Sequence, residues 1–366
     1  MRPFLLTSVM TVAAAAFACS TSSAPATSSG EGSSGSSGSS GTSGSTVDPD
    51  GGPIGLDGGP APQGSYSVTF GPEPIAAGQE STKCVVKRLA NPASMHVGTV
   101  HNVLGPGSHH LIVYRVNDTV ERPTPFACKP FSDTLDLTKG STLMISQKKD
   151  DALVLPEGVA YTLGAGQMVR LEMHYINPGA TPIMAQATST FIPIEDAKFK
   201  DEADFLFIGT PDVQLAAGES KTFGPMHTKL PAVYDDVTFF AITGHEHQFG
   251  TNVLVSTAMS RTDPGTPVYD VKNWLWSEPA TVQGNFKLPK GGGFNFSCSY
   301  TNTSGGPVKF GESANDEMCF FWAYYYPSKG GAKVCVHTEQ GQQPGGPGVD
   351  ACCPADNLIC NYLRSK

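Results

Sequence analysis

The chain has 366 residues, carries a formal net charge of −9 at pH 7 and is 39% hydrophobic. An acidic balance without a basic cluster argues against a nucleic-acid partner. The length exceeds what one compact core usually holds, so we expect more than one folded domain.

The N-terminus has the pattern of an export signal. Arg2 precedes the apolar run FLLTSVMTVAAAAFA, which leads into Cys19. A basic start, a short apolar stretch and small residues at the end are typical of a secretory signal, and the run is too short for a stable membrane span. The AFAC segment is also similar to a bacterial lipobox, in which the cysteine is lipidated, although Phe17 is unusual there. We therefore predict residues 1–19 as signal peptide and lipobox with Cys19 lipidated; simple cleavage after Ala18 is the alternative.

Residues 20–63 are mostly Ser, Gly, Thr and Pro. Such a segment cannot bury apolar surface and is expected to be a flexible tether. We expect an exported chain at the bacterial cell envelope, on the outer membrane or the periplasmic face. It would touch the membrane only through the lipid on Cys19, or would otherwise be secreted. Of the nine cysteines, an even number then remains for disulfides, as export favours.

Beyond the tether, short runs rich in β-branched and aromatic residues alternate with turn residues. Examples are SYSVTF, HHLIVYRV, QMVRLEMHYI, DVTFFAITG and CFFWAYYY, in a chain with 41 Gly and 29 Pro. This pattern predicts an all-β fold of antiparallel β-sandwiches. The charged segment 194–204 is the expected hinge between two tandem sandwiches. The first sandwich is predicted at residues 64–195 and the second at 200–338. A cysteine-containing tail is predicted at 339–366.

The segment TGHEHQFG places His245 and His247 one residue apart. Because side chains alternate along a strand, both imidazoles would point to one face and reach one metal ion. A chance pair on a solvated face is the alternative.

His174 lies in QMVRLEMHYI, where Leu171, Met173 and Tyr175 form an apolar side and His174 belongs to the other, mostly polar side. This favours a role facing a cleft, with a merely solvated histidine as the alternative. His109 and His110 are adjacent, so a regular strand would point them to opposite faces. Four more histidines show no local pattern and are expected to be structural or solvated: His96, His101, His227 and His337.

Met318 and Cys319 sit in SANDEMCFFWAYYYP. A methionine in such a run is usually part of the core. A bridge from Cys319 to Cys298 would, however, hold Met318 in place. A thioether beside two imidazoles would select a soft, redox-active ion, copper above all.

Four segments in this order, HHLIVY, LEMHY, HEHQFG and NDEMC, resemble the copper type II ascorbate-dependent monooxygenases. This family includes peptidylglycine α-hydroxylating monooxygenase and dopamine β-monooxygenase, and the similarity runs over most of residues 80–335. The resemblance implies two jelly-roll-like sandwiches that each hold one copper ion. His109, His110 and His174 would hold the electron-transfer copper. His245, His247 and Met318 would hold the catalytic copper, where O2 and substrate meet.

The reaction that the resemblance implies is hydroxylation of an unactivated C–H bond in a small organic substrate that the sequence does not identify. One oxygen atom enters the product, the other leaves as water, and a reductant such as ascorbate donates two electrons. No Asp or Glu completes either ligand set, which argues against a hydrolytic zinc site. Two alternatives remain: a copper-binding or copper-buffering surface lipoprotein without turnover, and a disulfide-stapled adhesin with incidental histidines.

Some positions depart from the family pattern. Thr243 stands where the peptide-amidating enzymes have an arginine for the substrate carboxylate, and Trp322 replaces a tyrosine that assists it. Without a guanidinium the bidentate grip is lost, so we do not expect glycine-extended peptides as substrates. Glu172 replaces a glutamine. Phe320 and Trp322 share the Met318 face and could line a substrate pocket, although ordinary core is the preferred interpretation.

The resemblance also implies the disulfide Cys298–Cys319. Cys84 aligns with a family cysteine whose partner is missing here, which leaves Cys128, the other cysteine of the first domain. Three pairings remain open for Cys335, Cys352, Cys353 and Cys360. A metal cluster built on Cys352 and Cys353 is conceivable, but export favours cystines.

Overall fold

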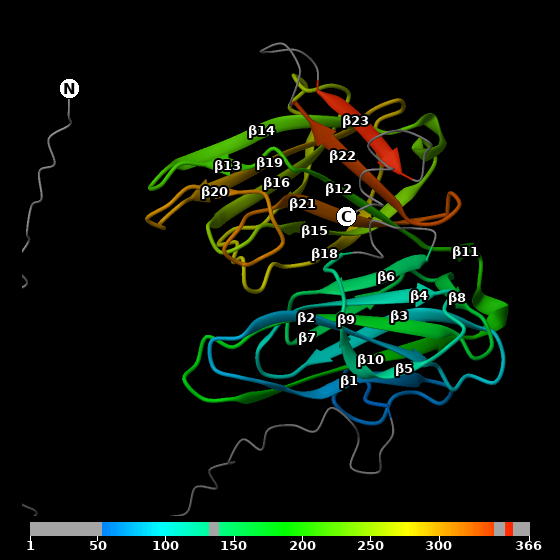
Figure 1. Cartoon of the computed structure of the whole chain (residues 1–366). Helices are drawn as coiled ribbons and strands as arrows, with labels where there is room; N and C mark the ends of the chain where they lie inside the picture. The colour runs from blue at the N-terminus through cyan, green and yellow to red at the C-terminus, as the bar shows by residue number, and fades with distance from the viewer. Residues whose placement is uncertain (1–52, 132–138, 340–347, 354–366) are drawn as a thin grey trace, which may run out of the picture. The chain divides into compact units, whose positions relative to one another are not determined.

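The computed structural model describes residues 53–131, 139–339 and 348–353 (Figure 1). The predicted signal, the Cys19 lipidation site and most of the tether lie outside these residues. The described residues contain no α-helix, only two 3-10 turns, η1 Asp196–Lys198 and η2 Ala232–Tyr234. The prediction of an all-β fold is confirmed.

Strands β1 to β11 build two sheets, and the described residues belong to one compact unit. The first sheet has the order β1-β10-β3-β8-β11, with β7 paired to β3, and consists of β1 Tyr66–Ile75, β10 Ile183–Ile194, β3 Met95–Leu104, β8 Val159–Leu163, β11 Asp201–Glu202 and β7 Asp150–Val154. The second has the order β5-β2-β9-β4-β6, from β5 Arg122–Ala127, β2 Glu80–Arg88, β9 Met168–Ile176, β4 Ser108–Val116 and β6 Gly140–Ser146.

Strands β12 to β23 build three more sheets. A six-stranded sheet has the order β18-β15-β21-β12-β22-β23, from β18 Val282–Phe286, β15 Thr238–His245, β21 Cys319–Tyr326, β12 Asp204–Thr210, β22 Lys333–Thr338 and β23 Val349–Cys353. A four-stranded sheet has the order β14-β19-β16-β17, from β14 Ser220–Lys229, β19 Gly293–Thr301, β16 Gly250–Ala258 and β17 Thr266–Asp270. A short sheet pairs β13 Gln214–Leu215 with β20 Val308–Lys309.

Strand β21 is buried on both faces, as its continuous apolar sequence requires. The side chains of Phe320, Trp322 and Tyr324 belong to the same apolar cluster as the core of the first two sheets. The intervening residues, such as Phe321 and Tyr325, belong to the core between the six-stranded and four-stranded sheets. The sheet that contains β21 therefore packs one face against the core of the first two sheets. Its other face packs against the core that it shares with the four-stranded sheet.

Three disulfides are described: Cys84–Cys128, Cys298–Cys319 and Cys335–Cys352. The last one attaches residues 349–353 to the six-stranded sheet as β23, so this part of the expected tail is an edge strand. Cys353 is also disulfide-bonded, and Cys360 lies outside the described residues.

No helix within the described part of the chain has the length and apolar character needed to cross a membrane.

Candidate metal centre

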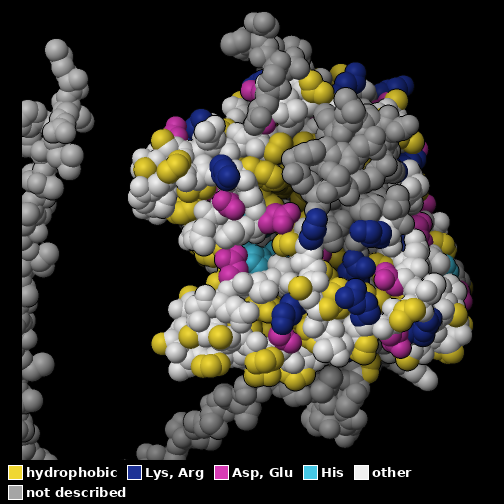
Figure 2. Space-filling model, viewed as in Figure 1, with side chains coloured by type: hydrophobic (Ala, Val, Ile, Leu, Met, Phe, Trp, Pro, Cys, Tyr) yellow, Lys and Arg dark blue, Asp and Glu magenta, His cyan; other side chains and the backbone are white. Residues whose placement is uncertain are grey.

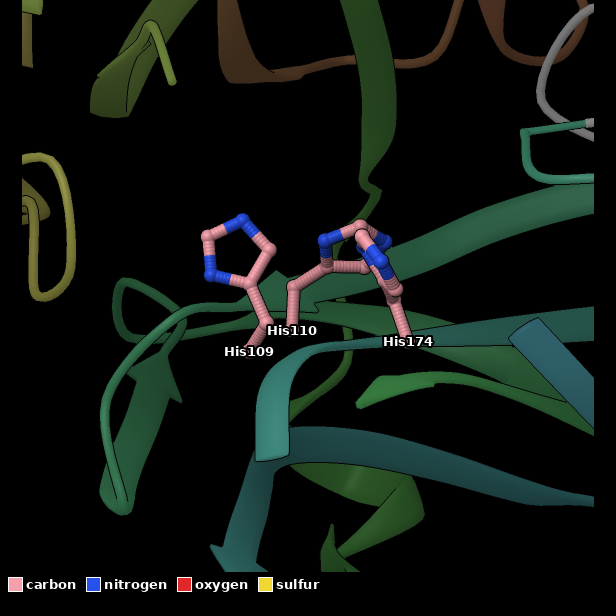
Figure 3. A group of neighbouring side chains, drawn as sticks. All are labelled: His109, His110 and His174. Carbon is pink, nitrogen blue, oxygen red and sulfur yellow. The ribbon is translucent and has the colours of Figure 1, made fainter. Parts of the chain in front are cut away.

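A β-bulge brings the adjacent His109 and His110 to one side of the sheet. Strand β4 pairs with β9 so that Ser108 faces Tyr175 and His110 faces His174, and the register shifts between these two pairs. A bulge inserts one extra residue and changes the direction of the side chains around it. Strict alternation does not hold here, and His109, His110 and His174 gather (Figure 3).

The three rings offer nitrogen atoms that all lie within 4.8 Å of one another. Burial lowers the pKa of His109 and of His110 well below the usual value, so both rings stay neutral. Nε2 of His109, both ring nitrogens of His110 and Nδ1 of His174 are buried without a hydrogen-bond partner. Buried polar atoms are rarely left unsatisfied. A metal ion would satisfy one nitrogen of each of the three rings.

The other ring nitrogen of His174, Nε2, is hydrogen-bonded to Glu80. Its Oε1 lies 3.0 Å from His174 Nε2. The hydrogen bond from His174 is the main cause that lowers the pKa of Glu80 to about 2, so the carboxylate is ionised near neutral pH. Figure 2 shows histidine surface in a recess with acidic side chains beside it.

His245 and His247 also lie together, but strand alternation is not the reason. Strand β15 ends at His245, and His247 lies in the following turn. The Glu317 carboxylate holds this turn by accepting the backbone N–H groups of His247 at 2.9 Å and Phe249 at 2.7 Å. The two imidazole centroids are 5.0 Å apart. The predicted proximity is therefore present with a different physical cause.

The hydrogen bonds of these two rings indicate which nitrogens are free. His247 Nδ1 lies 3.1 Å from the carbonyl oxygen of Asp316 and must donate to it, which leaves the lone pair on Nε2. The Gln147 amide nitrogen donates to His245 Nδ1 at 2.9 Å, so the neutral ring carries its hydrogen on Nε2, which is buried without a partner. The opposite orientation of the amide would let Gln147 Oε1, also buried without a partner, accept from Nδ1 and would leave the Nε2 lone pair for a metal. Burial lowers the pKa of His245 well below its usual value and that of His247 to about 4.

The glycines that flank this pair are needed for packing. A Cβ atom on Gly244 would lie 2.6 Å from Val253 Cγ1 and 2.7 Å from Tyr269 Cε1. A Cβ atom on Gly250 would overlap the side chain of Glu246. Larger residues at either position would push the histidine turn away from the sheet.

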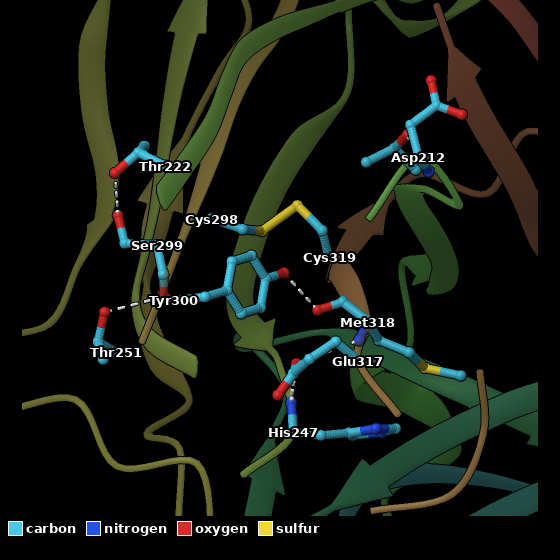
Figure 4. Close-up of a disulfide and its surroundings, with 11 residues drawn as sticks. Asp212, Thr222, His247, Thr251, Cys298, Ser299, Tyr300, Glu317, Met318 and Cys319 are labelled. Carbon is cyan, nitrogen blue, oxygen red and sulfur yellow. Dashed lines mark hydrogen bonds between the residues drawn. A yellow bond between two sulfur atoms is a disulfide. The ribbon is translucent and has the colours of Figure 1, made fainter. Parts of the chain in front are cut away.

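Met318 immediately precedes β21 and is fixed by its neighbours (Figure 4). The Tyr300 hydroxyl donates to the Met318 carbonyl at 2.7 Å, and the next residue, Cys319, is bridged to Cys298. The Met318 side chain is 4% exposed. In Figure 4 it extends from the backbone in the same direction as the His247 ring.

The two groups of histidines adjoin each other. The ring centroids of His109 and His247 are 6.2 Å apart. The ring of Phe131 lies 5.2 Å from that of His110 and 6.3 Å from that of His245. The five histidines thus form one continuous buried cluster.

Glu172, two residues before His174, has its carboxylate held by two hydrogen bonds. Its carboxylate accepts the Tyr114 hydroxyl at 3.0 Å and the Phe131 backbone N–H at 2.7 Å. Burial raises its pKa to about 7. Phe131 has a φ of 53°, a conformation uncommon for a bulky residue, and the bond to Glu172 helps to hold it there.

Four residues lie around the histidine cluster that the sequence did not predict to be there: Glu80, Phe131, Gln147 and Trp276. The Trp276 ring lies 5.4 Å from that of His109. These residues come from separate strands and loops and form no spacing motif, so no local signal marked them.

The positions that depart from the family pattern are buried. Thr243 is 1% exposed, and its hydroxyl bonds that of Thr281 at 2.9 Å. Phe320 and Trp322 are 5% and 0% exposed and lie in the apolar core, which agrees with the preferred interpretation of this aromatic run. The remaining histidines have local partners, namely Thr162 for His96, Asp150 for His101, Asn295 for His227 and Asp350 for His337.

Comparisons with known proteins find one family match. Residues 222–343 match the family described as "Copper type II ascorbate-dependent monooxygenase, C-terminal domain". This segment contains His245, His247 and Met318. A search of curated proteins found no match.

Two solved structures have a distant likeness to this chain. One is the glycosylasparaginase PNGase F from Flavobacterium meningosepticum, at 12% identity and a TM-score of 0.31, over 72% of this chain and 95% of that chain. The other is the major capsid protein P2 of bacteriophage PM2, at 11% identity and a TM-score of 0.31, over 73% of this chain and 99% of that chain. TM-scores this low support no inference about function.

Proposed function

Since residues 222–343 match the C-terminal domain of the copper type II ascorbate-dependent monooxygenases, we propose that this protein is a copper-dependent monooxygenase. It hydroxylates an unactivated C–H bond of a small organic substrate with O2 and a reductant of the ascorbate type. The observation that carries the proposal is the buried cluster of five histidines, four of which have buried ring nitrogens without a hydrogen-bond partner.

The donor set fits copper better than other common ions. Neutral imidazoles suit copper in both oxidation states, and a thioether favours the reduced one. His109, His110 and His174 hold one ion, and His245, His247 and Met318 hold a second. Bound copper supplies the one-electron redox chemistry that reaction with O2 requires.

The protein side chains contribute position and exclusion of water. Glu80 and the Asp316 carbonyl each accept a hydrogen bond from one ring nitrogen of a histidine and so leave the lone pair on the other. The Gln147 amide binds Nδ1 of His245 and restrains the orientation of that ring. The phenyl ring of Phe131 fills space between the two groups and keeps it apolar. Thr243 offers no positive charge, so the substrate is not recognised through a carboxylate at this position.

Oxygen consumption by copper-loaded protein with ascorbate tests the proposal, with aromatic amines, small peptides and lipids as trial substrates. We expect one hydroxylated product per O2 for an accepted substrate. Met318→Ala should abolish coupled hydroxylation while the three-histidine copper stays bound. Hydroxylation that survives Met318→Ala, or fewer than two copper equivalents per chain after reconstitution, would overturn the assignment.

The alternative is a copper-binding or copper-buffering lipoprotein without turnover, which would bind copper and yield no hydroxylated product with any substrate. In either case we propose export and attachment to the cell envelope through lipidated Cys19. Mass spectrometry of the mature N-terminus distinguishes lipidation from simple cleavage.

A further inference from the structure

Glu80 contacts His174 of the three-histidine group and the segment that leads into Met318. It is the first residue of β2 and pairs with Ile176, two residues beyond His174 on β9. Its Oε1 lies 3.0 Å from His174 Nε2 and accepts the backbone N–H of Ala314 at 3.0 Å. Its Oε2 accepts the Ser313 hydroxyl at 3.3 Å. One carboxylate therefore joins the three-histidine group to the segment that leads into Met318.

The bond to His174 determines which ring nitrogen faces the cluster. An ionised carboxylate can only accept hydrogen bonds, so His174 Nε2 must carry the hydrogen. The lone pair of the neutral ring then lies on Nδ1, which is buried without a partner. Carboxylates that bind the outer nitrogen of a ligand histidine fix its tautomer and raise its basicity.

The second contact reaches the other ligand group through a short segment. Asp316 lies two residues after Ala314, and its carbonyl oxygen accepts the hydrogen of His247 Nδ1. Glu317 comes next, and its carboxylate accepts the His247 backbone N–H. Loss of the Glu80 carboxylate would release the start of the segment that positions both His247 and Met318.

We propose that Glu80 is a positioning residue that couples the two candidate copper sites, by fixing His174 with Nδ1 toward its metal and by anchoring residues 313–318 beside the second site. This inference rests on the proposed ligand sets but not on catalytic turnover.

The matched variants are Glu80→Ala, Glu80→Gln and the control Glu73→Gln. Glu73 forms an ion pair with Lys83, which lies on the same strand as Glu80. The glutamine at position 80 keeps one acceptor oxygen without the charge. It should preserve the tautomer of His174 while weakening copper binding. All variants are made in the full chain.

Two measurements use the metal-free protein and so do not depend on copper chemistry. Nitrogen-15 NMR at pH 8 should show His174 with hydrogen on Nε2 in the wild type and in Glu73→Gln, and a mixture of tautomers in Glu80→Ala. Amide hydrogen exchange should become faster at Ala314 and through residues 316–318 in Glu80→Ala alone. An unchanged tautomer, or unchanged exchange at these amides, would overturn the proposal.

Competition titration with Cu(I) supplies the third measurement. We expect Glu80→Ala to weaken the three-histidine site roughly 10- to 100-fold and the methionine site by roughly fivefold or more. A loss confined to the three-histidine site would refute the coupling. If copper binds as expected in the wild type but no substrate is hydroxylated, the proposed function fails while the role of Glu80 stands.

Discussion

Removal of the Cys298–Cys319 disulfide should weaken the methionine-containing copper site specifically. Cys319 follows Met318 directly, and its bridge to β19 restrains the position of the thioether. The matched control is Cys335–Cys352, which joins strands β22 and β23 at the edge of the sheet that contains β21. Both bridges are replaced by alanine pairs.

The two bridges should contribute almost equally to stability. They span sequence separations of 21 and 17 residues. The loop-entropy relation gives about 3 kcal/mol for each at 25 °C. Urea denaturation should therefore show similar losses of unfolding free energy for the two double variants, so any difference in copper binding cannot be attributed to global stability.

Copper binding is measured by Cu(I) competition and by X-ray absorption at the copper edge. We expect the Cys298→Ala/Cys319→Ala protein to lose part or all of the copper–sulfur contribution and the Cys335→Ala/Cys352→Ala protein to keep it. Equal copper–sulfur signals in both proteins, alongside equal stability losses, would refute the idea that the bridge positions Met318.

Three further perturbations test the structure around the site. Tyr300→Phe leaves the Met318 carbonyl without its buried donor and should cost about 1–3 kcal/mol, measured by urea denaturation. Burial raises the pKa of Asp151 from 3.8 to about 6, so the native state holds this proton more tightly than the unfolded state does. Between pH 4 and pH 7 the unfolding free energy of the wild type should fall by on the order of 3 kcal/mol relative to that of Asp151→Asn. Parallel pH profiles of the urea midpoint for the two proteins would contradict this. Gly244→Ala places a Cβ 2.6 Å from Val253 and should cost about 1–3 kcal/mol, with weaker copper binding because the adjacent histidine shifts; an unchanged Tm would exclude the clash.

Strand alternation is a local property, and the sequence predicted its consequences well. The split of β21 into two faces, with Phe320 and Trp322 on one and Phe321 on the other, follows from the period of two. The all-β fold follows from many such runs separated by Gly and Pro. Short motifs in the right order were enough to select the candidate ligand histidines.

Strand alternation does not describe the candidate ligand histidines. His109 is displaced by a bulge whose position depends on the pairing of β4 with β9. His247 lies beyond the end of β15 and is held by Glu317, 70 residues away in the sequence. Neither departure has a local sequence signal, because each depends on the segment that lies opposite.

By itself the sequence determined the fold class and which residue types are available for a soft, redox-active metal, since short-range patterns of side chains encode both. Only the tertiary structure decided how the candidate ligand groups meet and which residues orient them. The contact of Glu80 with Ala314 joins residues 234 positions apart. Such contacts arise when separate strands pack together, and no spacing along the chain specifies them.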